Sequence, residues 1–398
     1  MMAAIAAASA GIRPLLLEKM PEPGRKLLLT GNGRCNLGND LDPARFIGDC
    51  GPRARFLRNA LHQFGGGDTV RFFAERGVTV QLENRHQYFP RRGGAAAVLE
   101  ALLAELRRSG AEVRAAAAIT GVRGGPGRFE LLAGGEMLRC RSLVLATGGR
   151  SYPATGSDGS GHDLAASLGH AVTPVHPGNV PLRVTGGWTA RLQGISLAEC
   201  ALAIGKGGAA PAFAGGLVFT HYGISGPAAL AASRPLAPAL ERGPVAAALD
   251  LLPALSVQRL DRELVSRAAR FGKKTIKGLV GMLLPDRLAG VVVDHLALPP
   301  AVPASQLTAR QRAGLVRAIK RFPLTIEGTR GFGEAMVTIG GVDLRGVDPA
   351  TMGSQRMTGL HFCGELLDLD GPCGGYNLQI AWTTGWVAGR SAARGLRP

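Results

Sequence analysis

The chain has 398 residues, which is too long for one hydrophobic core and predicts two or three domains. Hydrophobic residues make up 46% and charged residues 19%, which excludes a disordered chain, and no apolar run reaches the roughly 18 residues of a membrane span. The net charge of +17 favours polyanionic partners, although an arginine-rich composition by itself also produces such an excess.

The cysteines point to a reducing compartment. All six are scattered along the chain without a C-x-x-C pair, which argues against a disulfide framework and against a zinc site. We therefore expect a cytoplasmic protein without a bound metal.

The N-terminal segment has the pattern of the second half of a dinucleotide-binding βαβ unit. Residues 1–10 predict an alanine-rich helix that ends at Gly11, and residues 12–17 predict an apolar strand that ends in Glu18. An acid at this place accepts hydrogen bonds from the ribose of an adenine dinucleotide, although an ordinary surface Glu is the alternative. The first half of such a unit is a strand followed by a Gly-rich turn. We expect the sequence to start too late, at Met1, to contain either of them.

The following segments predict an α/β domain with two inserts. Helices are expected at 68–77 and 95–110, strands at 78–82, 129–132, 142–146 and 359–364, and a C-terminal helix at 377–394. Short strands and turns at 177–252 favour a small antiparallel barrel or sandwich, 256–321 is helical with a break at 299–303, and 324–339 returns to strand. The predicted fold is a Rossmann-like domain (1–176 and 340–398) with a β-barrel-like insert (177–255 and 322–339) and a helical insert (256–321).

Three glycine-rich segments are candidates for binding a cofactor. The loop at 25–39 offers closely spaced N–H groups around Gly31 and Gly33, with Arg34, Cys35 and Asn36 beside them, and suits a pyrophosphate or a flavin edge. A small-residue turn, Thr147, Gly148 and Gly149, ends a buried strand. A plain Gly-rich hairpin and an ordinary α/β turn are the respective alternatives.

The third segment carries the sharpest pattern. A strand ends in Gly364 and Glu365, Asp368 and Asp370 follow, and the run 371–377 (GPCGGYN) leads into an apolar helix. The positive end of that helix would stabilise an anion such as the N1–C2=O edge of a reduced flavin. An ordinary Gly-rich helix entry is the alternative.

These stretches resemble the BaiN/YhiN-like family of NAD(P)/FAD-dependent oxidoreductases. The matching runs are GRKLLLTGNGRCN, ATGGRSYPATGSDGSGHDLAASLGH, FTHYGISGPA, FPLTIEGTRGFGEAMVTIGGV and GELLDLDGPCGGYNLQIAWTTGWVAG. The resemblance implies a Rossmann-like FAD-binding domain, FAD as cofactor and NAD(P)H as reductant. The residues that it implies for cofactor binding are Glu18, Lys26, Gly31, Gly33, Arg34, Cys35, Asn36, Ile119, Thr147, Gly148, Gly149, Gly364, Glu365, Asp370, Gly374, Gly375, Tyr376 and Asn377.

The chain departs from this family at its start. Members have a strand and a G-x-G-x-x-G turn before the helix that begins here at Met1. We expect a mis-assigned start or a truncated fragment, and severely weakened FAD affinity if the chain begins at Met1.

The reaction expected from the resemblance is reduction of a polarised C=C bond, which needs a hydride and a proton donor. Candidate donors are the thiols of Cys35 and Cys373, because a thiol is mostly protonated at pH 7, followed by His221, Tyr222 and Tyr152. Each has a structural alternative, as a packing residue, a barrel turn or a loop aromatic.

Two substrate classes stay open on the sequence. The family includes ribosomal RNA dihydrouridine synthases and reductases of conjugated enones in steroid-like acids. The net charge and local basic groups favour RNA, with solvated helix faces as the alternative. These groups are Arg53/Arg55/Arg58, Arg91/Arg92, Lys273/Lys274/Lys277 and Arg310/Arg312/Arg317/Lys320/Arg321. A non-catalytic flavoprotein or RNA-binding scaffold is a third hypothesis.

Overall fold

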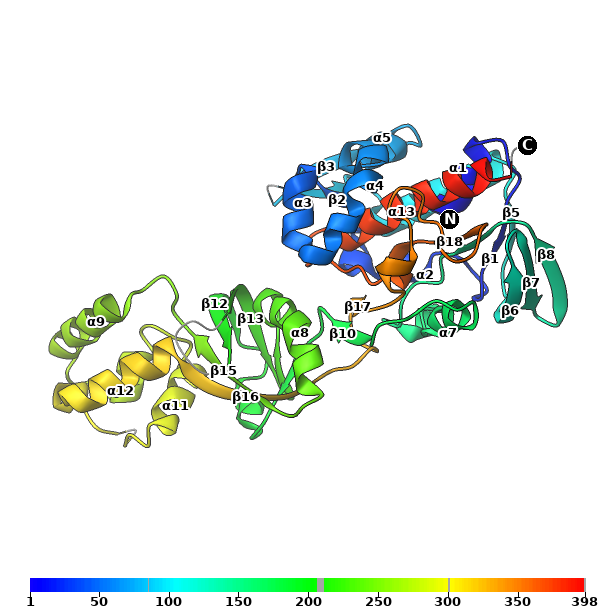
Figure 1. Ribbon diagram of the computed structural model, residues 1–398. Helices are drawn as coiled ribbons and strands as arrows, with labels where there is room; N and C mark the ends of the chain where they lie inside the picture. The colour runs from blue at the N-terminus through cyan, green and yellow to red at the C-terminus, as the bar shows by residue number, and fades with distance from the viewer. Residues whose placement is uncertain (85, 206–210, 300, 397–398) are drawn as a thin grey trace. The chain divides into compact units, whose positions relative to one another are not determined.

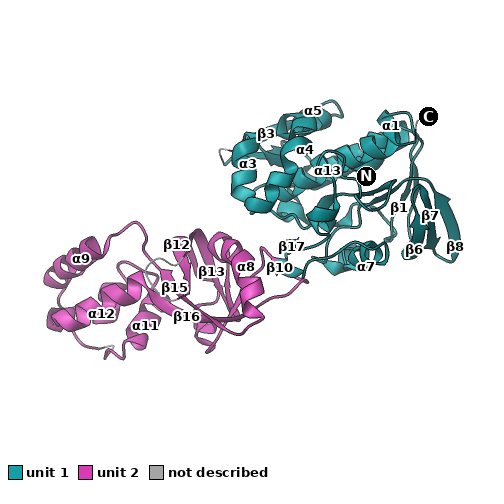
Figure 2. Ribbon diagram, viewed as in Figure 1, with its two compact units in different colours: residues 1–177, 335–398 teal, residues 178–334 magenta. Residues whose placement is uncertain are grey.

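The computed structural model describes residues 1–84, 86–205, 211–299 and 301–396, so residue 300 of the predicted helix break lies outside the described residues. The chain forms two units, which are coloured separately in Figure 2. Unit 1 comprises Met1–Pro177 and Ala335–Pro398, and unit 2 comprises Gly178–Glu334. Among the described residues, no helix is both long enough and apolar enough to span a membrane.

Unit 1 contains short parallel strand pairs surrounded by helices (Figure 1). Its helices are α1 (Met2–Ser9), α2 (Arg25–Leu29), η1 (Thr30–Gly33), α3 (Pro43–Cys50), η2 (Pro52–Leu57), α4 (Arg58–Gln63), α5 (Gly66–Ala74), α6 (Gly94–Arg108), η3 (Pro153–Thr155), α7 (Ser160–Ser167), η6 (Leu344–Gly346), η7 (Gly364–Leu366) and α13 (Tyr376–Arg394). Its strands are β1 (Leu15–Leu17), β2 (Gly38–Asn39), β3 (Val80–Glu83), β4 (Gln87–Pro90), β5 (Glu112–Arg114), β6 (Ile119–Gly125), β7 (Arg128–Ala133), β8 (Glu136–Cys140), β9 (Leu143–Leu145), β10 (His176–Gly178), β17 (Val337–Ile339) and β18 (Leu360–Phe362).

The strand pairing of unit 1 brings both ends of the chain together. β1 pairs in parallel with β5, and β9 pairs in parallel with β18, with Phe362 opposite Leu145. Because the carboxyl ends of parallel strands share one edge, the turns after β9 and β18 lie next to each other. β6, β7 and β8 form an antiparallel meander, and β2, β4 and β3 form another antiparallel sheet.

Helices α1 and α13 pack closely against each other in unit 1 (Figure 1). Their contact is lined by the glycines of a G-x-x-x-G spacing in α13, Gly385 and Gly389. A Cβ atom built on Gly389 would lie 2.0 Å from the carbonyl oxygen of Ala3. The absence of a side chain at Gly389 therefore sets the distance between the two helices.

Unit 2 is a closed six-stranded barrel joined to a group of helices. The strand order is β11-β14-β13-β12-β15-β16, which confirms the predicted barrel. The strands are β11 (Leu182–Val184), β12 (Ser196–Ile204), β13 (Ala212–Thr220), β14 (Gly223–Ser225), β15 (Val245–Asp250) and β16 (Phe322–Thr329), and the helices are η4 (Trp188–Leu192), α8 (Pro227–Leu240), α9 (Val257–Arg270), α10 (Ile276–Val280), α11 (Asp286–His295), η5 (Ala304–Gln306) and α12 (Ala309–Lys320).

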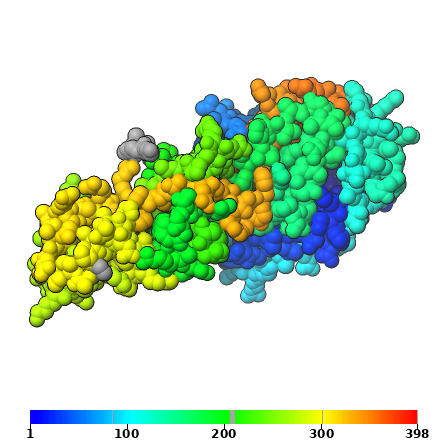
Figure 3. Space-filling view, turned by 90° about the horizontal axis from the view of Figure 1, so that it is seen from below, coloured from blue at the N-terminus to red at the C-terminus, as the bar shows by residue number. Residues whose placement is uncertain are grey.

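One hydrophobic core runs through both parts of unit 2. It joins barrel side chains such as Leu249 and Phe322 to helix side chains such as Leu264 and Leu315. In Figure 3 the helical part (yellow) accordingly lies against the barrel strands. The two predicted inserts thus form a single unit in the structure.

Several sequence predictions need correction. The predicted loop at 25–39 begins with the helix α2, and the predicted strand at 324–339 is divided into β16 and β17 by a turn. β17 pairs with β10, and residues 335–339 therefore belong to unit 1 and not to the barrel insert. Helix α8 was missed because Pro235 and Pro238 lie inside it, and proline ordinarily disfavours a helix interior.

Candidate FAD-binding site

A polar cluster around Glu365 joins distant segments of unit 1. Its Oε2 lies 2.5 Å from Nζ of Lys26, and its Oε1 accepts from Oγ of Ser151 at 2.5 Å. Lys26 also donates to Oγ of Ser151 at 2.7 Å. The structure thus brings the predicted Lys26 and Glu365 together, and adds Ser151, which the sequence analysis missed.

The same carboxylate fixes the turn after β9. The N–H of Thr338 donates to Oε1 of Glu365 at 2.8 Å, and Oγ1 of Thr338 accepts from the N–H groups of Arg150 and Ser151 at 2.7 and 3.1 Å. A Cβ on Gly149 would lie 2.3 Å from Oγ1 of Thr338 and 3.0 Å from Oε1 of Glu365. Gly149 therefore allows the turn to reach the acid, as a small-residue turn at a ligand edge requires.

The other two residues of that turn are held by the segment leading into α7. A Cβ on Gly161, in the first turn of α7, would lie 1.7 Å from Oγ1 of Thr147. A Cβ on Gly148 would lie 2.8 Å from Oγ of Ser157, and Gly148 has a φ of +76°. The turn thus lies against the N-terminal end of α7, where free N–H groups favour anions.

The loop at 31–36 meets the turn that begins α13. The side-chain amide of Asn36 is oriented so that both its oxygen and its nitrogen form hydrogen bonds. The oxygen accepts from the N–H of Gly375 at 3.1 Å, and the nitrogen donates to the carbonyl of Gly38 at 2.8 Å. A Cβ on Gly375 would lie 2.3 Å from that carbonyl. Two predicted segments, about 340 positions apart, therefore form one wall.

Two buried acceptor atoms beside this wall fit a flavin. Oδ1 of Asn39 and Oε1 of Gln379 are buried and have no hydrogen-bond partner among the described residues. Asn39 donates its amide to the carbonyl of Gly374 at 3.5 Å, which places it at the same turn. Orphaned acceptors of this kind need a donor, and a flavin ring N–H is such a donor. The residues present therefore fit the cofactor.

Glu18 lies at the carboxyl end of β1. Its N–H donates to the carbonyl of Arg114, and its Oε1 accepts from the N–H of Met20, both within 2.9 Å. The neighbouring Lys19 binds Asp158 at 2.5 Å. Burial opposes ionisation of Asp158, but the bonds from Lys19 and Ser160 outweigh it and lower its pKa to about 2. The carboxyl end of β1 is thus tied to the loop before α7.

The other residues that the sequence analysis predicted to bind the cofactor lie in different segments of unit 1. Ile119 begins β6, opposite Ala133. The N–H of Gly364 donates to Oγ1 of Thr384 at 2.9 Å, and the Asn377 amide closes its own turn by bonding both backbone groups of Gly371. Asp370 lies near Arg53, whose guanidinium binds the buried Asp368.

Two of the candidates bind protein groups elsewhere. Arg34 bonds both oxygens of Glu83 at 2.6 and 2.8 Å, and its guanidinium lies 4.4 Å above the Phe89 ring. The hydroxyl of Tyr376 donates to Asp49 at 2.7 Å, and its ring packs in the core. Both side chains thus bind other groups of the protein, which leaves their backbone groups to contact the cofactor. Their role in cofactor binding stays a prediction.

The proton-donor candidates differ in exposure. The Cys35 side chain is 0% exposed, and burial raises the pKa of its thiol to about 11. Cys373 is exposed, with its sulfur 4.0 Å from that of Met336, in the turn before α13. Tyr152 lies in the turn after β9 with a φ of +51°. Accessibility therefore favours Cys373 over Cys35.

The other two candidates, His221 and Tyr222, belong to unit 2. They form the turn between β13 and β14 of the barrel, with their rings 4.9 Å apart. The Arg330 guanidinium lies 4.5 Å from the Tyr222 ring. Their role in catalysis stays a prediction.

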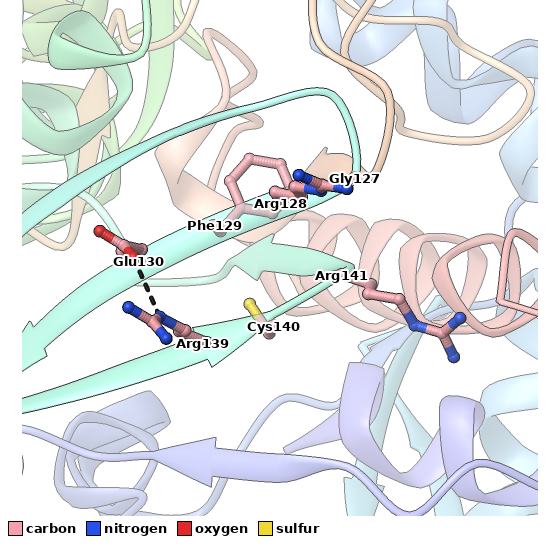
Figure 4. A pocket seen from close by; sticks show the side chains of 7 residues that line it. All are labelled: Gly127, Arg128, Phe129, Glu130, Arg139, Cys140 and Arg141. Carbon is pink, nitrogen blue, oxygen red and sulfur yellow. Dashed lines mark hydrogen bonds and ion pairs between the residues drawn. The ribbon is translucent and has the colours of Figure 1, made fainter.

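A pocket of about 560 Å³ on the β7–β8 surface is a poor candidate for the cofactor (Figure 4). It is lined by Gly127, Arg128, Phe129, Glu130, Arg139, Cys140 and Arg141. None of these is a predicted site residue, and Glu130 neutralises Arg139 at 3.0 Å and Arg123 at 3.3 Å. The site described above, by contrast, lies at the edge where the parallel strands end.

The model of the HI0933-like protein Rossmann domain family matches residues 1–391. The chain belongs to this family. The membership confirms the resemblance seen in the sequence and the Rossmann-like fold, and it makes the chain an FAD-dependent oxidoreductase.

Individual proteins agree with the assignment. The chain is 37% identical over 396 residues, 98% of its length and 96% of the relative's, to the 3-dehydro-bile acid delta(4,6)-reductase of Clostridium scindens. It is 32% identical over 380 residues, 93% of its length and 90% of the relative's, to the ribosomal RNA dihydrouridine synthase of Haemophilus influenzae. The fold resembles that of 3-ketosteroid-delta4-(5alpha)-dehydrogenase from Rhodococcus jostii, with a TM-score of 0.51 and 15% identity over 98% of this chain and 94% of that one.

Replacing Glu365 by Gln is expected to weaken FAD binding about tenfold, or about 1.4 kcal/mol. The amide keeps the bond from Thr338 but leaves Lys26 without its counter-ion in a largely buried cluster, where breaking a pair is costly. Titration of the apoprotein by flavin fluorescence measures the change. Glu136→Gln, an exposed acid of β8, is the matched control, and equal affinities of the two variants would contradict the prediction.

Proposed function

We propose that the chain reduces the C5=C6 bond of uridine in ribosomal RNA to dihydrouridine, with NAD(P)H as the reductant. The observation that carries the RNA part of the proposal is the distribution of charge. Residues 256–321 hold thirteen Lys and Arg against four Asp and Glu, a net charge of +9 out of +17 for the whole chain. More than half of the positive excess thus lies in one sixth of the sequence, which genomic composition does not explain.

The reaction type is supported by the two relatives named above. Each name describes an enzyme whose reaction concerns a C=C bond conjugated to a carbonyl group, in a steroid ring or in uracil. Saturating such a bond adds a hydride to one carbon and a proton to its neighbour. NAD(P)H supplies the hydride and becomes NAD(P)⁺, FAD relays it when bound, and an acid of the protein supplies the proton.

The chain's own residues have distinct tasks in this scheme. Glu18 would hold the adenine ribose, while Lys26 and Glu365 would position the segments around the ribityl chain. The N-terminus of α13, with Gly375 held by Asn36, would stabilise negative charge on the flavin. Cys373, exposed in the turn before α13, donates the proton to the substrate carbon.

A small-molecule enone is the second candidate substrate. The 37% identity to the bile-acid reductase, against 32% for the RNA enzyme, is the observation that favours it. The two candidates differ in their response to salt, since RNA binding weakens steeply with ionic strength whereas binding of a steroid acid, which carries one carboxylate, depends on it weakly.

The direct test is an incubation of the FAD-loaded chain with unmodified ribosomal RNA and either NADH or NADPH. Nucleoside mass spectrometry then measures dihydrouridine, and parallel reactions contain a 3-oxo-4,6-diene steroid acid. We expect dihydrouridine to accumulate with one nicotinamide and the steroid to stay unchanged. Steroid reduction without dihydrouridine would refute the RNA proposal in favour of the second candidate.

Replacing Cys373 by Ala is expected to lower the turnover number by a factor of about 100 to 10,000, the usual contribution of a general acid. Reduction of the bound flavin by NAD(P)H should keep its rate, because that half-reaction does not use the donor. Rapid-mixing measurements of the two half-reactions test this. Cys140→Ala, at a half-buried thiol of β8, is the control. Unchanged turnover in Cys373→Ala would assign the proton to another group.

A further inference from the structure

Helices α9 and α12 of unit 2 lie side by side (Figure 1). Together they form a groove of about 820 Å³. Ser256 caps α9 and Thr308 caps α12, each by accepting from the N–H three residues ahead. Both helices are therefore well defined from their first turn. The groove is lined by Val257, Gln258, Asp261, Arg262, Ala313, Val316, Arg317, Lys320 and Arg321.

The groove has an apolar floor and a basic rim. Val257, Ala313 and Val316 form the apolar part, and Val257 is 51% exposed, which is high for a valine in a packed helix. Arg262 and Arg317 are exposed at the rim. On α12 the lining positions 313, 316, 317 and 320 follow the three- and four-residue spacing of one helix face, so that they form a continuous stripe.

The ion pairs around the groove leave it positive. The Asp261 carboxylate is neutralised by Arg312 at 2.7 Å, and Lys320 is neutralised by Asp250 at 2.7 Å. Within the described part of the chain, the structure gives Arg262 and Arg317 no acidic partner. These two guanidinium groups therefore remain available for an external anion.

The geometry points to this groove as a binding site for a single-stranded segment of RNA. Arg262 and Arg317 bind successive phosphates, since a guanidinium matches a phosphate with two parallel hydrogen bonds. The apolar floor takes a sugar or an unstacked base, the form in which proteins contact single-stranded RNA. The net charge of +9 on residues 256–321 attracts a polyanion more than a short acidic peptide. The inference rests on the proposed function for RNA as the substrate.

The test uses the full chain and a fluorescently labelled oligouridine of about 20 nucleotides, longer than the roughly 4 to 16 nucleotides of a usual single-strand site. Arg262→Glu/Arg317→Glu is expected to weaken binding at least tenfold by fluorescence anisotropy. The slope of log affinity against log salt should become shallower by about 1.4, because each lost phosphate contact contributes about 0.7. Ala313→Phe, which fills the groove without changing its charge, should also weaken binding.

The control is Arg128→Glu/Arg141→Glu, which makes the same change of charge at two exposed arginines of unit 1 that lie outside the basic groups of the sequence analysis. Equal losses in both double variants would refute the groove and leave only a diffuse charge effect. Unchanged RNA affinity in Arg262→Glu/Arg317→Glu would also refute it, and would leave the groove to an acidic protein segment.

Failure of the proposed function gives a different pattern. If the parent chain makes no dihydrouridine but binds oligouridine through the groove, the proposed reaction is wrong and the RNA site stands. If dihydrouridine forms at equal rates in the parent and in Arg262→Glu/Arg317→Glu, with equal RNA affinity, the reaction stands and the groove is refuted. Thermal unfolding of each variant identifies any loss that comes from misfolding.

Discussion

Replacing Gly375 by Ala is expected to abolish most FAD binding and to destabilise unit 1 by about 2–4 kcal/mol. Gly375 has a φ of +88°, which costs a residue with a side chain about 1–2 kcal/mol. A methyl group there would also lie 2.3 Å from the carbonyl oxygen of Gly38 and 2.6 Å from Oδ1 of Asn36. Relief of these contacts has to move either the loop at 31–36 or the first turn of α13, and both form the same wall of the site.

Flavin titration and thermal unfolding of the apoprotein measure the two effects separately. Gly48→Ala in α3 is the matched control, because a Cβ atom there meets nothing within 4 Å and its φ is in the ordinary range. We expect Gly48→Ala to keep the parent affinity. If Gly375→Ala also kept it, the contact between the loop and the helix would have no part in holding the cofactor.

The strands and turns around the site could be predicted because their signals are local. A fully apolar run that ends in small residues predicted β9 and the turn at Gly149, and a glycine pair before an apolar run predicted the start of α13. Lys26 and Glu365 were assigned to one site by the resemblance to the family, and they are bonded in the structure.

The partners within the site could not be predicted, because they depend on contacts across the chain. Thr338 lies 27 positions from Glu365 and Ser151 lies 214 positions from it, and the sequence assigned neither a role although both lie in runs that match the family. The direction of a side chain is equally invisible in a sequence. Arg34 was a candidate ligand for the pyrophosphate, and the structure pairs it with Glu83 on β3.

The basic groups show the same limit. The sequence counted Arg53, Arg312 and Lys320 equally with the other cations, but each binds an acid of the protein. Arg262, which was in none of the counted groups, and Arg317 are exposed residues of the groove to which the structure gives no acidic partner among the described residues. Net charge alone thus led to the hypothesis of a polyanionic partner, and the pairing of charges in the structure was needed to propose a particular surface for it.

Replacing Gly389 by Ala is expected to destabilise unit 1 by about 1–3 kcal/mol, the usual cost of overpacking. The added methyl group would lie 2.0 Å from the Ala3 carbonyl, an atom of the helix backbone that no change of rotamer can move. The two helices must therefore separate, and α1 has only eight residues with which to adapt. Backbone amides of α1 should lose hydrogen-exchange protection before those of the barrel in unit 2 do.

The expected loss of stability comes from the position of Gly389 in the contact with α1. Replacing a glycine elsewhere in or next to α13 should not produce it. Gly395→Ala at the end of the same helix is the control, because a Cβ there has its nearest neighbours at 3.8 Å. That variant should be neutral or slightly stabilising, since alanine favours helix over glycine. If the two variants gave equal stability and equal protection of α1, close contact between the helices would not be what holds α1 in place. The G-x-x-x-G spacing of α13 would then need another explanation.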